Sequence, residues 1–169
     1  MNRADTGAQA PLLEVRDSPL HGLGVFAVRR IPRGTRVIEY LGERVSHTEA
    51  DRRYDHDGAG DNHTFLFILD SHTVIDAGVD GNEARFVNHS CEPNCESVIE
   101  SQRVYIDAIR TIEPGEELTY DYQLQREADD PPDIDAVFAC RCGLERCRGS
   151  MLWPPPRAPR PQGRRGRRR

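Results

Sequence analysis

Lysine is absent from this chain, and all 23 basic residues among its 169 are arginine. A GC-rich coding bias accounts for this composition as well as any selection on chemistry does. Long apolar runs are also absent, the longest being Phe65–Leu69, whereas a bilayer span needs about 18–20 residues. The N-terminus shows no basic-then-apolar leader, so we expect neither export nor a membrane partner. The cytoplasm is then the default compartment.

Acidic residues are absent from the last part of the chain, which carries seven arginines from Arg157 onward. Subtracting these seven positive charges from the formal net charge of −5 leaves −12 for the body. An acidic body would attract a cationic partner, although such a surface also serves solubility alone. The arginine-rich tail could contact nucleic-acid phosphates or an acidic partner, or have no specific partner at all.

The length suits one globular domain with tails. We expect residues 1–10 to be flexible and the Pro/Arg-rich residues 154–169 to be disordered, because neither can bury enough apolar surface. Residues 126–136 are acidic and contain proline, which indicates a linker.

Short strand-like segments separated by Gly, Pro and Asp predict a mainly β fold of several small sheets. They cover residues 12–15, 24–28, 35–41, 65–69, 73–75, 96–99, 104–109 and 117–120. Helices should be few and short, and only one start is well marked: Ser46, with Glu49 three residues later, suggests a capping box opening a helix to about Tyr54. Residues 31–34 and 112–115 each predict a Pro/Gly turn that is followed by a strand.

Cysteine is scarce, and the five present are an odd number clustered in the second half. Cys140, Cys142 and Cys147 form a Cys-x-Cys-x4-Cys pattern, a spacing that suits a tetrahedral metal site better than a disulfide framework. A fourth ligand must then come from elsewhere.

The stretch Arg85-Phe86-Val87-Asn88-His89-Ser90-Cys91-Glu92-Pro93-Asn94 is dense in polar groups. By itself it could be a binding segment or a solvated loop. The chain also contains His21-Gly22-Leu23-Gly24-Val25-Phe26 and Glu117-Leu118-Thr119-Tyr120-Asp121-Tyr122. In this order and spacing the three motifs resemble the SET-domain methyltransferases, and the cysteine pattern resembles the post-SET segment of that family.

The resemblance implies a SET fold of several small sheets with a knot-like substructure, in which the Asn-His-Ser-Cys and Asp-Tyr segments meet. The SET domain would cover residues 11–125, and a C-terminal post-SET zinc segment residues 137–153. The activity implied is transfer of a methyl group from S-adenosyl-L-methionine to a lysine of another protein, since this chain has no lysine of its own.

The resemblance also implies a donor site. Its residues would be the turn His21, Gly22, Leu23 and Gly24, together with Phe65, Arg85, Asn88, His89, Tyr122 and Leu152. The turn could equally be an ordinary hairpin, and Phe65 could equally be a core residue.

Three tyrosines match catalytic positions of the family: Tyr122 as the catalytic tyrosine, with Tyr40 and Tyr120 lining the substrate channel beside Trp153. Tyr122 would position and polarise the methyl group rather than act as a strong base. Tyr120 occupies the position where tyrosine leaves less room than phenylalanine, so we expect mainly monomethylation, with dimethylation as the alternative. Alternatively, each tyrosine could be a structural residue whose buried hydroxyl binds a backbone group. Trp153 could likewise make only a loose contact.

In the family pattern Cys91 completes a structural Zn²⁺ site with Cys140, Cys142 and Cys147. Cys95 is then spare, although it lies close enough to compete with Cys91. The expected substrate is a lysine of a basic protein such as a histone or a histone-like protein. A ribosomal or other non-chromatin target, a SET-like binding module without catalysis, and a zinc-dependent nucleic-acid binder are the alternatives. Delivery as a secreted effector to a host nucleus is an alternative to the cytoplasm.

Overall fold

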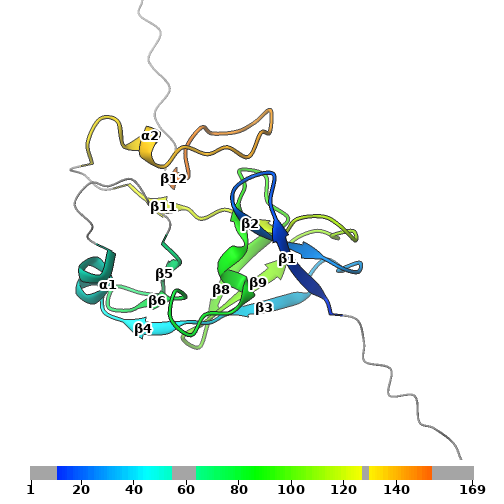
Figure 1. The fold of residues 1–169 in the computed structure, drawn as a ribbon, viewed down its shortest axis with the longest axis horizontal. Coiled ribbons are helices and arrows are strands. Elements are labelled where there is room, and N and C mark those ends of the chain that lie inside the picture. Colours follow the sequence, from blue (N-terminus) through cyan, green and yellow to red (C-terminus); the bar gives the residue numbers. More distant parts are fainter. Residues whose placement is uncertain (1–10, 55–63, 127–129, 154–169) are drawn as a thin grey trace, which may run out of the picture.

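The computed structural model describes residues 11–54, 64–126 and 130–153. The two expected tails, and residues 127–129 of the expected linker, lie outside them. Within the described part, the chain is built mainly from strands in five small sheets, with two short α-helices and one 3₁₀ turn (Figure 1). This confirms the predicted fold class. In chain order the elements are β1 Leu13–Asp17, β2 Leu23–Ala27, β3 Arg36–Tyr40, β4 Glu43–Val45, α1 His47–Tyr54, β5 Leu66–Ile68, β6 Val74–Asp76, η1 Glu83–Phe86, β7 Asn88–His89, β8 Cys95–Glu100, β9 Arg103–Ala108, β10 Thr119–Tyr120, β11 Leu124–Gln125, α2 Ile134–Val137 and β12 Leu152–Trp153.

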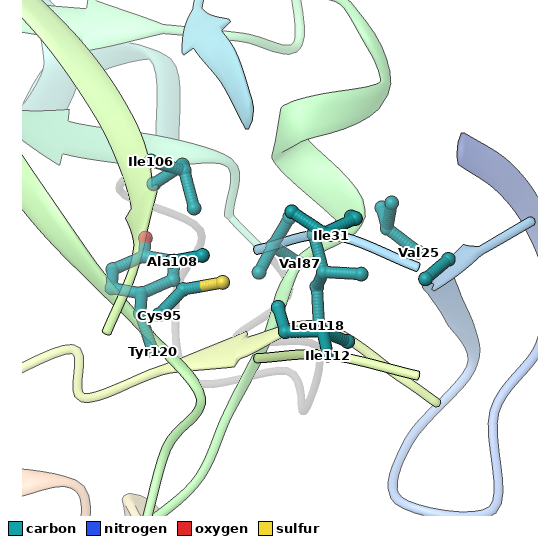
Figure 2. Packing of buried hydrophobic residues seen from close by; sticks show 10 residues of the cluster. Val25, Ile31, Val87, Cys95, Ile106, Ala108, Ile112, Leu118 and Tyr120 are labelled. Carbon is teal, nitrogen blue, oxygen red and sulfur yellow. The ribbon is translucent and has the colours of Figure 1, made fainter. Parts of the chain in front are cut away.

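The antiparallel sheet β3-β9-β8 carries the main core. Val104, Ile106 and Ala108 alternate along β9 with more exposed residues, so one face of the sheet is buried. Two of these side chains, Ile106 and Ala108, pack with the residues drawn in Figure 2, among which the Cys95 sulfur is enclosed. Burial of this apolar face fixes the register, because a slip of one residue would expose it.

The two similar Pro/Gly turns pack against each other. Ile31 and Ile112 form an isolated antiparallel bridge between them, and both side chains are fully buried. Gly34 and Gly115 follow with φ angles of +80° and +86°, a conformation that favours glycine. The turns therefore tie the connection between β2 and β3 to the segment that leads into β10.

Helix α1 begins as predicted at the Ser46 cap, whose hydroxyl accepts a hydrogen bond from the Glu49 N–H at 3.2 Å. Only half of the predicted capping box forms, since the Glu49 carboxylate binds Arg52 and Arg53 at 2.8 Å instead. The helix contacts the small sheet β4-β6-β5.

Two pairs of short parallel strands join segments distant in sequence, and the sequence did not predict the strand pairing itself. Strand β7 pairs with β10, placing Asn88 beside Thr119 and His89 beside Tyr120. This confirms that the Asn-His and Asp-Tyr segments meet. Strand β11 pairs with β12, placing Leu124 beside Leu152.

The expected acidic linker is partly structured. Helix α2 begins within it at Ile134, and Arg126 binds Asp135 through two hydrogen bonds of 3.2 and 2.6 Å. The linker interpretation missed this helix because four residues give no visible helical period.

Candidate active site and metal centre

Three predicted tyrosines lie in one aromatic row. The Tyr120 and Tyr122 ring centroids are 4.8 Å apart, and Phe67, which the sequence did not single out, lies between Tyr120 at 6.5 Å and Tyr40 at 5.4 Å. The row joins the end of β10 to β5 and the end of β3. Residues distant in sequence thus form one apolar wall with phenol groups.

The hydroxyls of two of these tyrosines donate to backbone carbonyls. Tyr122 donates to the Val87 oxygen at 2.9 Å, and Tyr40 donates to the Phe65 oxygen at 3.0 Å. Burial raises the pKa of all three tyrosines above their usual range, so the phenols stay protonated at neutral pH. Such groups can orient a reactant but cannot act as strong bases.

Asn88 joins β7 to the glycine turn between β1 and β2. Its side-chain Nδ2 donates to the backbone oxygens of His21, at 3.2 Å, and Leu23, at 3.0 Å. Gly22 in this turn has a φ of +48°. The turn and Asn88, both expected at the donor site, are therefore in direct contact.

His89 faces the interior between the tyrosines and the cysteines. Its Nδ1 accepts a hydrogen bond from the Tyr122 N–H at 3.1 Å, and its Nε2 lies 3.6 Å from the Cys91 sulfur. Burial lowers the pKa of His89 to about 4, so the ring is neutral and Nε2 carries the hydrogen. Because both ring nitrogens already have partners, His89 would have to contact a bound methyl donor through its backbone.

Arg85 and Phe65 lie close to each other beside the Tyr40 end of the tyrosine row. The Arg85 guanidinium is 4.6 Å from the Phe86 ring centroid and 5.5 Å from that of Phe65, and it donates to the Ala77 oxygen at 3.1 Å. Phe65 is half-buried and also packs against the core cluster that contains Tyr40. The core alternative for Phe65 therefore has structural support.

Four thiols converge at the C-terminal end. The sulfurs of Cys91, Cys140, Cys142 and Cys147 all lie within 4.8 Å of one another. Cys91 is 3.5 Å from Cys140 and 3.9 Å from Cys147, close to the roughly 3.8 Å expected between thiolates around a tetrahedral zinc.

The donor chemistry fits Zn²⁺, which favours closed sites of four thiolates. Three backbone N–H groups, from Cys142, Arg148 and Gly149, also point at these sulfurs at 3.4–3.5 Å. Cys95 is excluded from the cluster: it is fully buried among apolar side chains, and burial raises its pKa to about 12.

An ion pair connects this cluster to the tyrosine row. Arg148 donates to both carboxylate oxygens of Asp121, at 2.6 and 2.8 Å, and both side chains are largely buried. The Arg148 backbone N–H reaches the Cys91 sulfur at 3.4 Å, and its guanidinium lies 5.4 Å from the Trp153 ring centroid.

Leu152 and Trp153 form β12. Leu152 is buried, whereas 46% of Trp153 is exposed. Among the ring contacts and hydrogen bonds of the described residues, none joins Trp153 to the three tyrosines, so its place in a channel stays a prediction.

Comparison with known proteins decides the family. The sequence matches the family described as SET domain over residues 22–123. The chain belongs to the SET-domain family. It is 42% identical over 138 residues to histone-lysine N-methyltransferase trithorax of Drosophila virilis, covering 78% of this chain and 3% of that protein.

Two fungal relatives carry the name histone-lysine N-methyltransferase, H3 lysine-4 specific. The chain is 42% identical over 151 residues to that of Schizosaccharomyces pombe, covering 85% of this chain and 15% of the relative. It is 44% identical over 141 residues to that of Emericella nidulans, covering 79% and 11%. The chain thus spans only a small part of the length of these relatives.

The SET-domain match includes the tyrosine row, the glycine turn from Gly22, Asn88, His89 and Cys91, and ends before the three C-terminal cysteines. The cysteine cluster is what suggests a post-SET segment following the SET domain. None of the helices in the described part is long and apolar enough to span a membrane.

Besides Phe67 in the tyrosine row, sequence reasoning missed two polar residues of the site. Glu117, in the segment before β10, binds Asn88, and Arg148 binds Asp121. Both have a local signal, since Glu117 opens the motif that ends at Tyr122 and Arg148 directly follows Cys147. Neither partner could be assigned without knowing which segments of the SET domain meet.

Proposed function

We propose that this chain is a protein-lysine N-methyltransferase that transfers methyl from S-adenosylmethionine to a lysine of a basic protein such as a histone. The observation that carries the proposal is the β7–β10 pair of a SET domain, which brings Asn88 and His89 beside Tyr120 and Tyr122. The relatives named histone-lysine N-methyltransferase support a histone as the class of substrate.

The tyrosine row would receive the lysine side chain. When bound, S-adenosylmethionine supplies a methyl group on a positively charged sulfur. A lysine amine must be neutral to accept it, and deprotonation costs about 4–5 kcal/mol at pH 7. The buried surroundings of Tyr40 and Tyr120 lower this cost, because low polarity disfavours the ammonium form.

Tyr122 would align the reacting groups. Its hydroxyl hydrogen is engaged by the Val87 carbonyl, which leaves the oxygen lone pairs to face a polarised methyl group. Its main-chain N–H is held by His89. Holding reactants in line while excluding water is the chief need of this displacement.

The degree of methylation follows from Tyr120. A tyrosine hydroxyl there narrows the end of the channel, so we expect mainly monomethylation, with dimethylation as the alternative.

Cys91, Cys140, Cys142 and Cys147 would hold a structural Zn²⁺. Through Cys91 the metal would fix β7 to the C-terminal segment, so its removal should abolish activity by releasing that segment. The donor-site roles of Phe65, Arg85 and Leu152, the channel role of Trp153, and contact of the arginine-rich tail with nucleic acid belong to the same proposal. A cytoplasmic location and delivery as a secreted effector draw no support from relatives whose names concern histones.

The test is incubation of the zinc-loaded chain with isotopically labelled S-adenosylmethionine and, separately, core histones and ribosomal proteins. We expect label on lysine, and we expect Tyr122→Phe to reduce the labelling rate by about a hundredfold, the usual cost of misplacing the reacting groups. Tyr105→Phe is the matched control, since Tyr105 lies outside the tyrosine row, between Arg36 and Arg103.

Transfer to ribosomal proteins alone would favour the non-chromatin alternative. Donor binding without any transfer would indicate a binding module. DNA binding without donor binding would indicate a zinc-dependent nucleic-acid binder and contradict the proposal.

A further inference from the structure

Glu117 is a half-buried acid without a cationic partner among the described residues. Its neighbour Glu116 behaves as a surface acid and pairs with Arg110 at 3.0 Å. The Glu117 carboxylate is instead held by neutral donors. The Ser18 hydroxyl reaches its two oxygens at 2.8 and 2.9 Å, and Asn88 Nδ2 donates to Oε1 at 2.8 Å.

This carboxylate is one of three acceptors that together decide which way the Asn88 amide points. Nδ2 of Asn88 faces three acceptors, namely the His21 and Leu23 backbone oxygens and Glu117 Oε1. A flipped amide would place Oδ1 against all three acceptors, which is repulsive, so the orientation is fixed by chemistry. Oδ1 itself accepts no hydrogen bond from the described residues and is the amide's remaining acceptor.

The surroundings of Glu117 are built to keep it in place. Ser18 is anchored in the turn between β1 and β2, where its hydroxyl also accepts the Leu20 N–H at 2.9 Å. Gly24 leaves the space that the carboxylate occupies, because a Cβ at this position would overlap Glu117. Three segments far apart in sequence thus meet at one carboxylate.

We propose that Glu117 is a positioning residue for the methyl donor: it directs Oδ1 of Asn88 towards the α-ammonium group of S-adenosylmethionine. The inference rests on the proposed function, in which Asn88 is a donor-site residue, and it assigns Asn88 to the amino-acid part of the donor. A carboxylate one hydrogen bond behind Asn88 also adds negative charge that favours an ammonium group.

The experiment measures binding of two ligands by calorimetry. S-adenosylmethionine carries the amino-acid part, whereas 5′-methylthioadenosine lacks it. We expect Glu117→Ala to weaken S-adenosylmethionine binding by at least about tenfold, the usual cost of losing a hydrogen bond to a charged group. Binding of 5′-methylthioadenosine should not change.

Two further variants sharpen the result. Glu117→Gln keeps one acceptor for Asn88 and should recover most of the lost affinity. Glu116→Gln is the matched control and should bind both ligands as the unmodified chain does. Asn88→Ala combined with Glu117→Ala should be no weaker than Asn88→Ala alone, because the two residues act through the same contact.

The outcomes separate this inference from the proposed function. If the unmodified chain binds S-adenosylmethionine and Glu117→Ala binds it equally well, the positioning role is wrong and the proposed function stands. If Glu117→Ala weakens both ligands alike, Glu117 is only structural and the inference is overturned. If the unmodified chain binds no S-adenosylmethionine, the proposed function itself fails.

Discussion

The ion pair between Arg148 and Asp121 should couple the cysteine cluster to the tyrosine row. The change to make is Asp121→Asn, which keeps the size of the side chain and removes its charge. Arg148 donates two hydrogen bonds to this carboxylate at 2.6 and 2.8 Å, and only 15% and 17% of the two side chains are exposed. Hydrogen bonds between charged groups contribute about 1.5–3 kcal/mol each to stability, and the remaining exposure to water reduces this contribution. We expect Asp121→Asn to lower the free energy of unfolding of the C-terminal segment by about 2 kcal/mol. This corresponds to a change of about 30-fold in the unfolding equilibrium.

The measurement is a double-mutant cycle with Asp121→Asn, Arg148→Ala and the double variant. Trp153 is the sole tryptophan of the chain and lies against Arg148, so its fluorescence reports unfolding of the C-terminal segment. We expect a coupling energy of about 2 kcal/mol, reduced methyl transfer, and an unchanged zinc content. Arg146→Ala is the matched control, because Arg146 directly precedes Cys147 in the sequence and is exposed.

The coupling should also be insensitive to mild acid. Burial alone would raise the pKa of Asp121, but Arg148 outweighs it and holds that pKa below its usual range. A depressed carboxylate pKa stabilises the fold above the unfolded value of about 3.9 and loses this effect only as pH falls through the folded value. The coupling energy should therefore stay constant between about pH 5 and 8. Additive effects of the two substitutions, or normal activity in Asp121→Asn, would refute the reasoning.

Two further predictions concern the metal and the product. Cys91→Ser should abolish stoichiometric zinc binding, measured by elemental analysis, whereas Cys95→Ser should keep one zinc per chain, because Cys95 lies in the apolar core away from the cluster; the opposite pattern would make the ligand assignment wrong. Tyr120→Phe should shift the product from mono- towards di- and trimethyllysine in mass spectra, because the hydroxyl no longer occupies the end of the channel. A product distribution that stays unchanged would remove Tyr120 as the determinant.

Local patterns in the sequence carried much of the fold. Eight strand segments and the helix after Ser46 follow from apolar residues bounded by Gly, Pro and Asp, since these determine where a short strand can begin and end. Strands β7, β11 and β12 have only two residues each, too short for any alternation, and they form because partners distant in sequence complete their hydrogen bonds.

The sequence by itself indicated the family, the tyrosines, Asn88 and His89 as candidate site residues, and the cysteines available for a metal, because these depend on residue type and order. Only the tertiary structure decided their partners. It placed Cys91 in the cluster and Cys95 in the core, turned the His89 ring inward, and brought Glu117 to Asn88 and Arg148 to Asp121. The physical reason is that a hydrogen bond or an ion pair between residues 27 to 99 positions apart depends on chain topology, which no local pattern records.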